Sequence, residues 1–166
     1  MNLFKALRCT YFYYINYMKN TVVATNRKAY HEFQIIEKFE AGVHLLGSEV
    51  KSIREGKASL KQSYIAMRKG EAWLIGSHIA AYSHTGFEGH APIRNRKLLL
   101  HKKEILKIGS KIAEKGLTAV PTKLYIKSGL IKLEFGIAKG KKLYDKRNAK
   151  KKRDVQRDIA RVMKTK

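Results

Sequence analysis

Apolar and polar residues alternate with a period of two in several short stretches of the chain, a pattern typical of β-strands with one buried face. In residues 33–45 this alternation is present on both sides of Gly42. Because glycine often marks a turn or a bend, the stretch predicts two strands that are joined or bent at Gly42.

Two further pairs of alternating segments are separated by Lys-Gly and by Ser-Gly, which suit tight turns because glycine accepts a left-handed backbone. Both pairs predict β-hairpins. Residues 83–97 mix Gly, Pro, His and Arg without periodicity, and predict a long mobile loop. The predicted hairpins join residues 64–67 to 72–75 and residues 118–126 to 130–138.

Helical spacing is present in two segments. Ser48 is expected to cap a short helix that Gly56 ends, and Val50 and Ile53 lie on one face of it. Residues 101–116 hold isoleucines at helical spacing and predict a second helix that stops at the final glycine. Many short strands with two inserted helices favour a mainly β fold, a small closed or nearly closed antiparallel β-barrel with flanking helices, over βαβ units.

The charge of the chain points to an anionic partner. The chain has 36 Lys and Arg against 13 Asp and Glu, a formal net charge of +23. Such an excess opposes compact folding unless a polyanion balances it. Nucleic acid is favoured over an anionic membrane surface, because no long basic stretch carries the Trp, Phe and Leu face of an interfacial membrane helix.

The C-terminal segment, residues 139–166, holds nine Lys, four Arg and three Asp, which leaves too few apolar residues for a core. Four apolar residues nevertheless fall on one stripe of a helix, at i, i+4, i+7 and i+8. We therefore expect a basic tail that is disordered or helical, and that folds against a polyanion. The stripe consists of Val155, Ile159, Val162 and Met163.

Residues 1–21 are expected to be an N-terminal extension ahead of one domain at residues 22–138. Polar residues break its apolar run, and no small-residue cleavage pattern follows, so neither a membrane span nor a signal peptide is expected. Met18 is an alternative start. Cys9, the single cysteine, allows no internal disulfide and fits a reducing compartment, so the cytoplasm is the expected location.

No group of residues in the sequence indicates an enzyme. Residues 136–142 resemble a phosphate-binding loop, but they are one residue short between the glycines and have Lys142 in place of the magnesium-binding hydroxyl. The histidines lack the short spacings of zinc ligands, and no carboxylate pair stands out for acid–base chemistry. We expect a binding protein with no catalytic residue, cofactor or metal.

Four segments of the chain, taken in order, carry a family resemblance. They are ATNRKAYHEF (24–33), FEAGVHLLGSEVKSIREGKASL (39–60), RKLLLHKKEI (96–105) and GIAKGKKLYDKR (136–147). These segments resemble the SmpB family, the SsrA-binding proteins of bacterial trans-translation, and the resemblance extends over about residues 22–164.

The resemblance implies an oligonucleotide-binding-like (OB-like) β-barrel that grips the tRNA-like domain of transfer-messenger RNA (tmRNA, or SsrA). It further implies that the tail reaches the decoding centre and the empty mRNA channel of a stalled ribosome, where it meets small-subunit rRNA at the A site. The protein is then a monomer in a 1:1 complex with the RNA and catalyses no reaction.

Carried over by position, the resemblance also implies a set of tmRNA-binding residues. Lysines can neutralise phosphates, an amide can bond a base or ribose edge, and an exposed leucine can pack on an unstacked base. Glu40 can accept from base amino groups or ribose hydroxyls, or can orient a neighbouring lysine. The set is Asn26, Arg27, Lys28, Glu40, Lys97, Leu98, Leu99 and Lys132.

The same resemblance places ribosome-contacting residues in the tail. Many family members have His before the Asp of the tail, where this chain has Tyr144. Tyrosine preserves a ring that stacks on a ribosomal base, but a role that needs a protonated imidazole is lost. The set is Lys139, Lys141, Lys142, Tyr144, Asp145, Lys146 and Arg147, together with the apolar stripe.

Two other classes of protein stay open at this point. A structural protein of the ribosome or of another ribonucleoprotein shares the basic barrel and tail but needs no sensing helix. An enzyme acting on RNA is disfavoured, because the sequence shows no acid–base or metal constellation.

Overall fold

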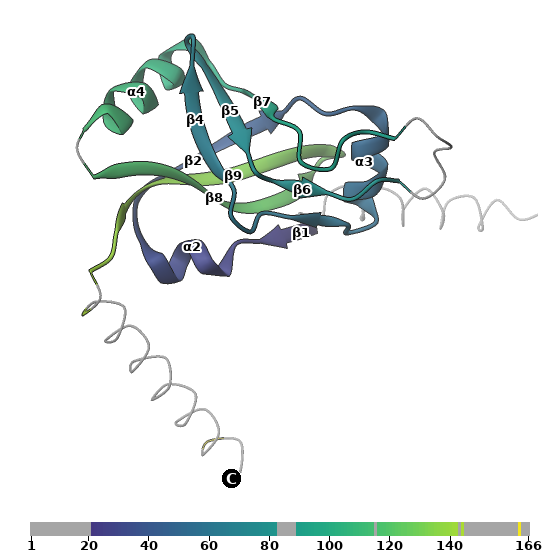
Figure 1. Cartoon of the computed structure of the whole chain (residues 1–166), viewed down its shortest axis with the longest axis horizontal. Helices are drawn as coiled ribbons and strands as arrows, with labels where there is room; N and C mark the ends of the chain where they lie inside the picture. Colours follow the sequence, from purple (N-terminus) through teal and green to yellow (C-terminus); the bar gives the residue numbers. More distant parts are fainter. Residues whose placement is uncertain (1–20, 83–88, 115, 143, 145–162, 164–166) are drawn as a thin grey trace, which may run out of the picture.

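The computed structural model describes residues 21–82, 89–114, 116–142, 144 and 163. Short strands dominate this part of the chain, and three helices lie among them (Figure 1). In chain order the elements are β1 (Thr21–Thr25), α2 (Arg27–Glu32), β2 (Phe33–Val43), α3 (Gly47–Arg54), β3 (Ala58–Ser59), β4 (Tyr64–Arg68), β5 (Glu71–Ile75), β6 (His78–Ile79), β7 (Arg96–Leu99), α4 (Lys102–Ala113), β8 (Leu117–Lys127) and β9 (Leu130–Gly140).

Six strands pair in a nearly closed antiparallel ring, in the order β8-β4-β5-β7-β2-β9, and β9 returns to β8. The closure between β4 and β8 is narrow, because the structure pairs only Ile65 with Ala119 there. Strand β1 adds to the edge of β8, and β3 pairs with β6 in a small separate sheet. The predicted mainly β, nearly closed barrel with flanking helices is confirmed.

Both predicted hairpins are present, and their turns have the expected backbone. In the β4–β5 turn Lys69 and Gly70 have φ of 49° and 73°, and in the β8–β9 turn Ser128 and Gly129 have φ of 49° and 78°. Two successive left-handed residues are typical of the tight turn whose twist matches that of paired strands. The Lys-Gly and Ser-Gly pairs therefore fix where the two hairpins fold back.

The stretch around Gly42 is a single strand, so the prediction of two strands joined there is wrong. Strand β2 pairs with β9 up to Gly42, and Gly42 and Val43 pair with β7. Gly42 thus has a partner on each side, Lys132 on β9 and Leu99 on β7. It marks the place where β2 changes neighbours, which a periodic sequence pattern does not reveal.

Both predicted helices are present close to the predicted residues, but the cap predicted for α3 is wrong. Helix α4 is confirmed, and it buries Ile108. Helix α3 begins at Gly47, so Ser48 lies inside it and is not its cap. The backbone N–H of Leu46 instead donates to the carboxylate of Glu49 at 2.8 Å. Gly56 ends this region with φ of 76°, as predicted.

Three further features differ from the sequence prediction or were absent from it. Strand β1 and helix α2 were not predicted. The loop predicted at residues 83–97 is too long, because Arg96 and Lys97 belong to β7; its residues 83–88 lie outside the described part of the chain. Strand β9 extends to Gly140, so Lys139 is part of the barrel.

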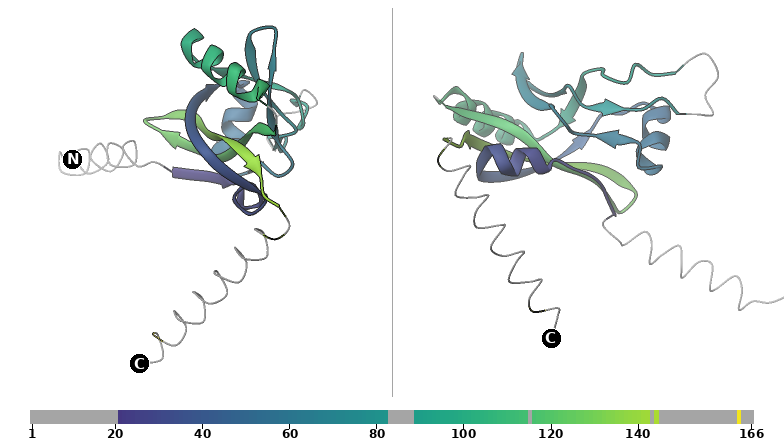
Figure 2. Two further views of the ribbon diagram at one scale, coloured as in Figure 1. Left: turned by 90° about the vertical axis from the view of Figure 1, so that its left-hand side faces the viewer. Right: turned by 60° about the horizontal axis from the view of Figure 1, so that its bottom comes forward.

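The core lies inside the ring, and alternate residues of β9 provide much of it. Leu133, Phe135 and Ile137 are fully buried, and the Phe135 ring stacks on Phe39 of β2 with centroids 5.6 Å apart. Helices α4 and α3 lie near opposite ends of the barrel, as Figures 1 and 2 show. Within the described residues, no helix is both long and apolar enough to span a bilayer.

Replacing Gly136 with alanine is expected to destabilise the barrel. A Cβ atom at this position would lie 2.6 Å from Ile35 Cγ2 and 3.2 Å from the backbone oxygen of Glu37, both on β2. The neighbouring strand has to shift, at a cost of about 1–3 kcal/mol in the free energy of unfolding, measured by urea denaturation. Gly109→Ala in α4 is the matched control, because nothing lies within 4 Å of its added Cβ. The control should stabilise the protein by about 0.5–1 kcal/mol through helix propensity; equal effects of the two substitutions would contradict this account.

Candidate nucleic-acid interface

One outer face of the barrel, formed by β1, β8, β9, β2 and β7, brings together half of the predicted RNA-binding residues, namely Glu40, Lys97, Leu99 and Lys132. Directly paired residues on neighbouring antiparallel strands lie on the same face of a sheet. One row of partners crosses all five strands of this face, which we call the basic face. The row consists, in order, of Val22, Tyr125, Lys132, Gly42 and Leu99.

The side chain of Leu99 lies over Gly42 in this row. A Cβ atom on Gly42 would be 3.3 Å from Leu99 Cβ and 3.4 Å from its Cδ1, and Leu99 is 54% exposed. Leu98 points to the other side of β7 and is 2% exposed. The structure therefore places Leu98 in the core, where it supports the face from within, and leaves Leu99 as the apolar residue on the surface.

Glu40 lies between two lysines of the basic face. Its Oε1 is 3.5 Å from Lys132 Nζ, its Oε2 is 3.5 Å from Lys127 Nζ, and the Tyr125 hydroxyl also donates to Oε2. The Tyr125 hydrogen bond and both lysines hold the pKa of Glu40 below its usual value against the opposing effect of burial. Of the two roles open for Glu40, orientation of neighbouring lysines is the one that this geometry favours.

Glu134 connects the basic face to α2. It is the cross-strand partner of Glu40, and it accepts from the hydroxyl groups of Thr122 at 2.8 Å and Tyr30 at 3.4 Å. Lys38 Nζ lies 3.4 Å from the same carboxylate. Burial raises the pKa of Glu134, but the Thr122 hydrogen bond and the charge of Lys38 lower it by more. Because Tyr30 belongs to α2, the helix and the sheet form one continuous polar surface.

Asn26 caps α2 and is buried, with 5% exposure. Its Oδ1 accepts from the N–H of Ala29 at 3.1 Å, while Nδ2 donates to the carbonyl oxygens of Leu60 at 3.2 Å and Pro121 at 3.1 Å. Both amide hydrogens are therefore used within the protein. In this structure Asn26 ties α2 to β8 and to the turn before β4, and offers no free donor to a base.

The cations that follow Asn26 are exposed. Arg27 and Lys28, together with Lys61 and Gln62, line a surface hollow of about 750 Å³. Lys28 pairs with Glu32 at 3.7 Å, one turn further along α2. On β7, Lys97 forms an ion pair with Glu71. Arg27, Lys28 and Lys97 thus all lie on the surface, where a phosphate can reach their charged groups.

The root of the tail is attached to α2. The N–H of Lys141 donates to the carbonyl oxygen of Glu32 at 2.9 Å, and Lys141 Nζ donates to that of Tyr30 at 3.1 Å. Lys142 and Tyr144 are exposed, and so is Met163. The remaining predicted tail residues lie outside the described part of the chain, namely Asp145, Lys146, Arg147, Val155, Ile159 and Val162.

Known proteins match the chain over most of its length. The model of the SmpB protein family matches residues 23–165. The chain belongs to the SmpB family. The SsrA-binding protein of Sulfurihydrogenibium sp. (strain YO3AOP1) is 53% identical over 149 residues, which cover 90% of this chain and 98% of that protein. That of Geotalea uraniireducens (strain Rf4) is 54% identical over 147 residues, 89% of this chain and 97% of the relative.

A solved structure agrees with this assignment. It is described as "tmRNA-SmpB: a journey to the center of the bacterial ribosome", and it covers 72% of this chain and 84% of its own chain with 42% identity and a TM-score of 0.61. The family resemblance carried by the four sequence segments is therefore confirmed.

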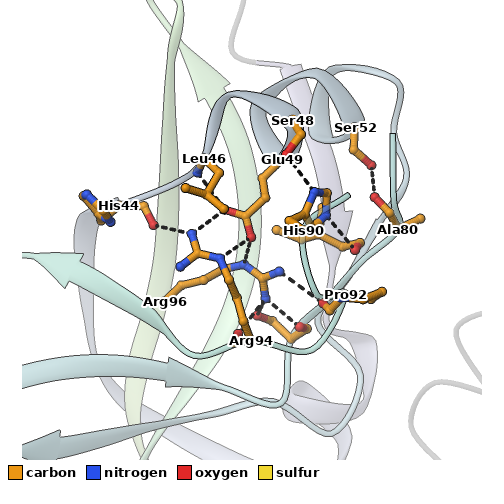
Figure 3. A network of polar contacts seen from close by, with 12 residues as sticks. His44, Leu46, Ser48, Glu49, Ser52, Ala80, His90, Pro92, Arg94 and Arg96 are labelled. Carbon is orange, nitrogen blue, oxygen red and sulfur yellow. Dashed lines mark hydrogen bonds and ion pairs between the residues drawn. The ribbon is translucent and has the colours of Figure 1, made fainter. Parts of the chain in front are cut away.

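Sequence reasoning missed a buried ion cluster that supports the basic face of this SmpB-family protein (Figure 3). Glu49 and Arg96 are both fully buried, with Arg96 Nε 2.9 Å from Glu49 Oε1, and Arg94 Nε donates to the same oxygen at 2.8 Å. Arg96 Nη1 also donates to the carbonyl oxygen of Ser77 at 2.7 Å, and Nη2 to that of Pro92 at 3.1 Å. The cluster fixes the start of β7, which carries Lys97 and Leu99.

The signal for this cluster in the sequence was weak, because the two arginines stand in a polar segment where charges are usually exposed. His90 belongs to the same region and is buried, although it was expected in a loop or at the surface. Its ring nitrogens lie 2.9 Å from Ser48 Oγ and 3.2 Å from the carbonyl oxygen of Ile79. The Ser48–His90 bond in Figure 3 joins α3 to the segment before β7, and the bond to Ile79 joins that segment to β6.

Glu49→Gln is expected to destabilise the protein strongly, because it leaves the buried Arg96 without its charge partner. Breaking a buried pair in this way costs about 3–5 kcal/mol. Glu55→Gln is the control: Glu55 pairs with Lys57 at 2.8 Å on the surface, and such pairs contribute less than about 1 kcal/mol. The two variants should separate clearly in urea denaturation, and a near-zero effect of Glu49→Gln would refute the supporting role of the cluster.

The pH dependence of the free energy of unfolding gives a second test of the Glu49→Gln variant. Burial raises the pKa of Glu49, but hydrogen bonds from Arg94 and the Leu46 amide, with the charge of Arg96, hold it below 4.5. A lowered folded-state pKa stabilises the fold above the unfolded-state pKa, and this stabilisation is lost as the pH falls through the folded value. The stability difference between wild type and Glu49→Gln should therefore be full at pH 7 and shrink below pH 4.5.

Proposed function

We propose that the protein binds the tRNA-like domain of tmRNA through its basic face and delivers that RNA to stalled ribosomes for trans-translation, without catalysing a reaction. Membership of the SmpB family and relatives named SsrA-binding proteins support the RNA partner. The observation that carries the proposal is the row of partners that places Lys132 and Leu99 on one exposed surface, where Glu40 pairs with Lys132.

The residues of the face suit a folded RNA with accessible phosphates and unstacked bases. Lys132, Lys127 and Lys97 neutralise phosphates, which supply most of the affinity for a nucleic acid. Leu99 offers an apolar contact for a splayed base. Glu40 acts mainly by holding its neighbouring lysines, because its oxygens already face Tyr125, Lys127 and Lys132.

Asn26, Arg27 and Lys28 take part at the edge of the same RNA contact. Because Asn26 is buried with both amide hydrogens used, we assign it a positioning role. It fixes the start of α2, and thereby the exposed side chains of Arg27 and Lys28 at the rim of the hollow. These two side chains supply the direct phosphate contacts there.

The tail is proposed to act on the ribosome after the barrel has bound RNA. Lys139 contributes its charge at the end of β9, and the chain leaves the barrel through Lys141 and Lys142. Tyr144 with the following Asp-Lys-Arg residues is proposed to meet the small-subunit rRNA of the A site. The apolar stripe is proposed to order as a helix in the empty mRNA channel. The protein acts as a monomer in a 1:1 complex with the RNA, in the cytoplasm, where both of its partners are.

Removing the chain from Asp145 onward tests this division of labour. The truncated protein should still bind the tRNA-like domain, because the barrel and Lys141 remain, but should fail to support peptide tagging in a reconstituted translation assay. Binding is measured with an excess of unrelated RNA, so that the lost tail charges do not decide the result. If truncation abolishes specific RNA binding itself, the proposal is wrong and a structural ribonucleoprotein role is favoured.

Tyr144 is expected to act through its ring. Tyr144→Phe should keep tagging near the wild-type rate, whereas Tyr144→Ala should lower it by about tenfold, the loss of roughly one base-stacking contact. Both variants should bind isolated tmRNA like wild type, which serves as the control for folding. Equal tagging by wild type and the alanine variant would exclude the stacking role.

A further inference from the structure

Tyr125 occupies a central position on the basic face that the family resemblance had not indicated. It lies in the five-strand row between Val22 and Lys132, and its hydroxyl group donates a hydrogen bond to Glu40 Oε2. Burial and the bond to Glu40 raise the pKa of the Tyr125 hydroxyl, so the donor keeps its proton at physiological pH. The hydrogen bond joins β8 to β2 across β9.

The carboxylate of Glu40 is almost fully engaged by its neighbours. Tyr125 and Lys127 approach Oε2, and Lys132 approaches Oε1. One hydrogen bond and two ion pairs thus engage both oxygens of this carboxylate within the protein. Each lysine lies at ion-pair distance from one Glu40 oxygen, 3.5 Å, and keeps its ammonium hydrogens for a further acceptor. The arrangement presents two cations whose separation is set by one shared anion.

We propose that Tyr125 is a positioning residue for RNA binding: through its hydrogen bond to Glu40 it holds Lys127 and Lys132 as a fixed pair that binds phosphates of the RNA backbone. This inference rests on the proposed function, because it assigns the RNA to this face. It adds Lys127 as a direct phosphate contact and Tyr125 as the residue that acts through Glu40.

The physical reason for such a support is the freedom of lysine side chains. Lys127 and Lys132 have side chains that are 50% and 30% exposed, and a free lysine loses rotamer entropy when it is fixed on a phosphate. Tyrosine has only two rotatable side-chain bonds, and Tyr125 lies on β8 between two paired neighbours, β1 and β9. Its hydroxyl therefore fixes Glu40, and Glu40 orders both lysines before the RNA arrives, which lowers the cost of binding.

A positioning role of Glu40 and an effect of its charge alone predict opposite changes in RNA affinity when Glu40 is removed. A carboxylate on a surface that meets phosphates repels them, so its removal should strengthen binding if the lysines act only through their charge. If Glu40 positions the lysines, its removal should weaken binding although the face becomes more positive. The sign of the change therefore separates the two explanations.

The experiment measures the affinity of the full chain for a labelled RNA of the tRNA-like domain of tmRNA, with and without added salt. Tyr125→Phe keeps the ring and the formal charge, and should weaken binding about fivefold, as expected for the loss of one hydrogen bond. Glu40→Gln should weaken binding at least as much. The double variant should bind no more weakly than Glu40→Gln alone, because Tyr125 acts through Glu40.

The salt dependence gives a readout that a purely structural defect would not change. Tyr125→Phe loses the fixed lysine pair but keeps the formal charge of the protein. Its slope of log K against log salt should therefore be smaller by the amount expected for about one lost phosphate contact. Glu40→Asp keeps the charge but shortens the side chain, and should also weaken binding. Urea denaturation of each variant shows whether the fold is intact.

Two matched controls are available in the chain. Glu37 also lies on β2 between two lysines, Lys107 and Lys111 of α4, but away from the basic face, so Glu37→Gln should not weaken binding. Tyr64 is an exposed tyrosine on β4, and Tyr64→Phe should bind like wild type. Weaker binding by these controls would indicate a general effect of the substitutions and overturn the inference.

The outcomes keep the two proposals apart. Tighter binding by Glu40→Gln, unchanged binding by Tyr125→Phe, or additive losses in the double variant would each overturn the positioning role while leaving RNA binding established. Failure of the wild-type protein to prefer this RNA over an unrelated RNA of equal length would overturn the proposed function itself.

Discussion

Strand β9 pairs along nearly its whole length with β2 on one side and β8 on the other, and the rest of the molecule depends on this register. Because side chains alternate along a strand, the register sends Leu133, Phe135 and Ile137 into the core and Lys132 and Glu134 to the outer face. A shift of one residue would exchange these two sets. The same pairing therefore fills the core and assembles the basic face.

The close pairing of these strands also explains why glycine is present at two positions. At Gly136 the β2 strand approaches so closely that a side chain would meet Ile35, and at Gly42 the Leu99 side chain occupies the space above the backbone. The first glycine permits the close pairing of β2 and β9, and the second gives Leu99 its position on the surface. Packing and the proposed RNA contact thus use the same property, the absence of a Cβ atom.

Much of the fold was predictable because its signals are local. The two hairpins follow from alternation with a Lys-Gly or Ser-Gly turn, and α4 follows from isoleucines at helical spacing. Strand β1, the change of partner at Gly42 and the narrow closure between β4 and β8 were not predictable, because they depend on pairing between residues far apart in the chain. Local pattern carries no information on which strand lies beside which.

The same limit of local sequence pattern applies to the candidate RNA-binding site. The family segments singled out Glu40, Leu99 and Lys132, because motif position carries over along the chain, and the structure places all three on one exposed surface. They did not show that Asn26 is buried and used within the protein, that Leu98 faces the core, or that Tyr125 bonds Glu40. Burial and orientation depend on the three-dimensional partners of each side chain, and Glu49 and Arg96 are the clearest case of charges that look exposed in sequence and are not.

The attachment of Lys141 to the end of α2 has a thermodynamic consequence for the tail. Residues 142–166 follow this anchor, and 25 residues span about 38 Å even in the compact form of a helix, so under the proposed function this segment reaches well beyond the barrel that holds the RNA. In the proposed function, contact between tail and ribosome is an intramolecular event once the RNA has docked, with an effective concentration on the order of millimolar. A weak contact is then enough, and it is released as soon as the RNA leaves.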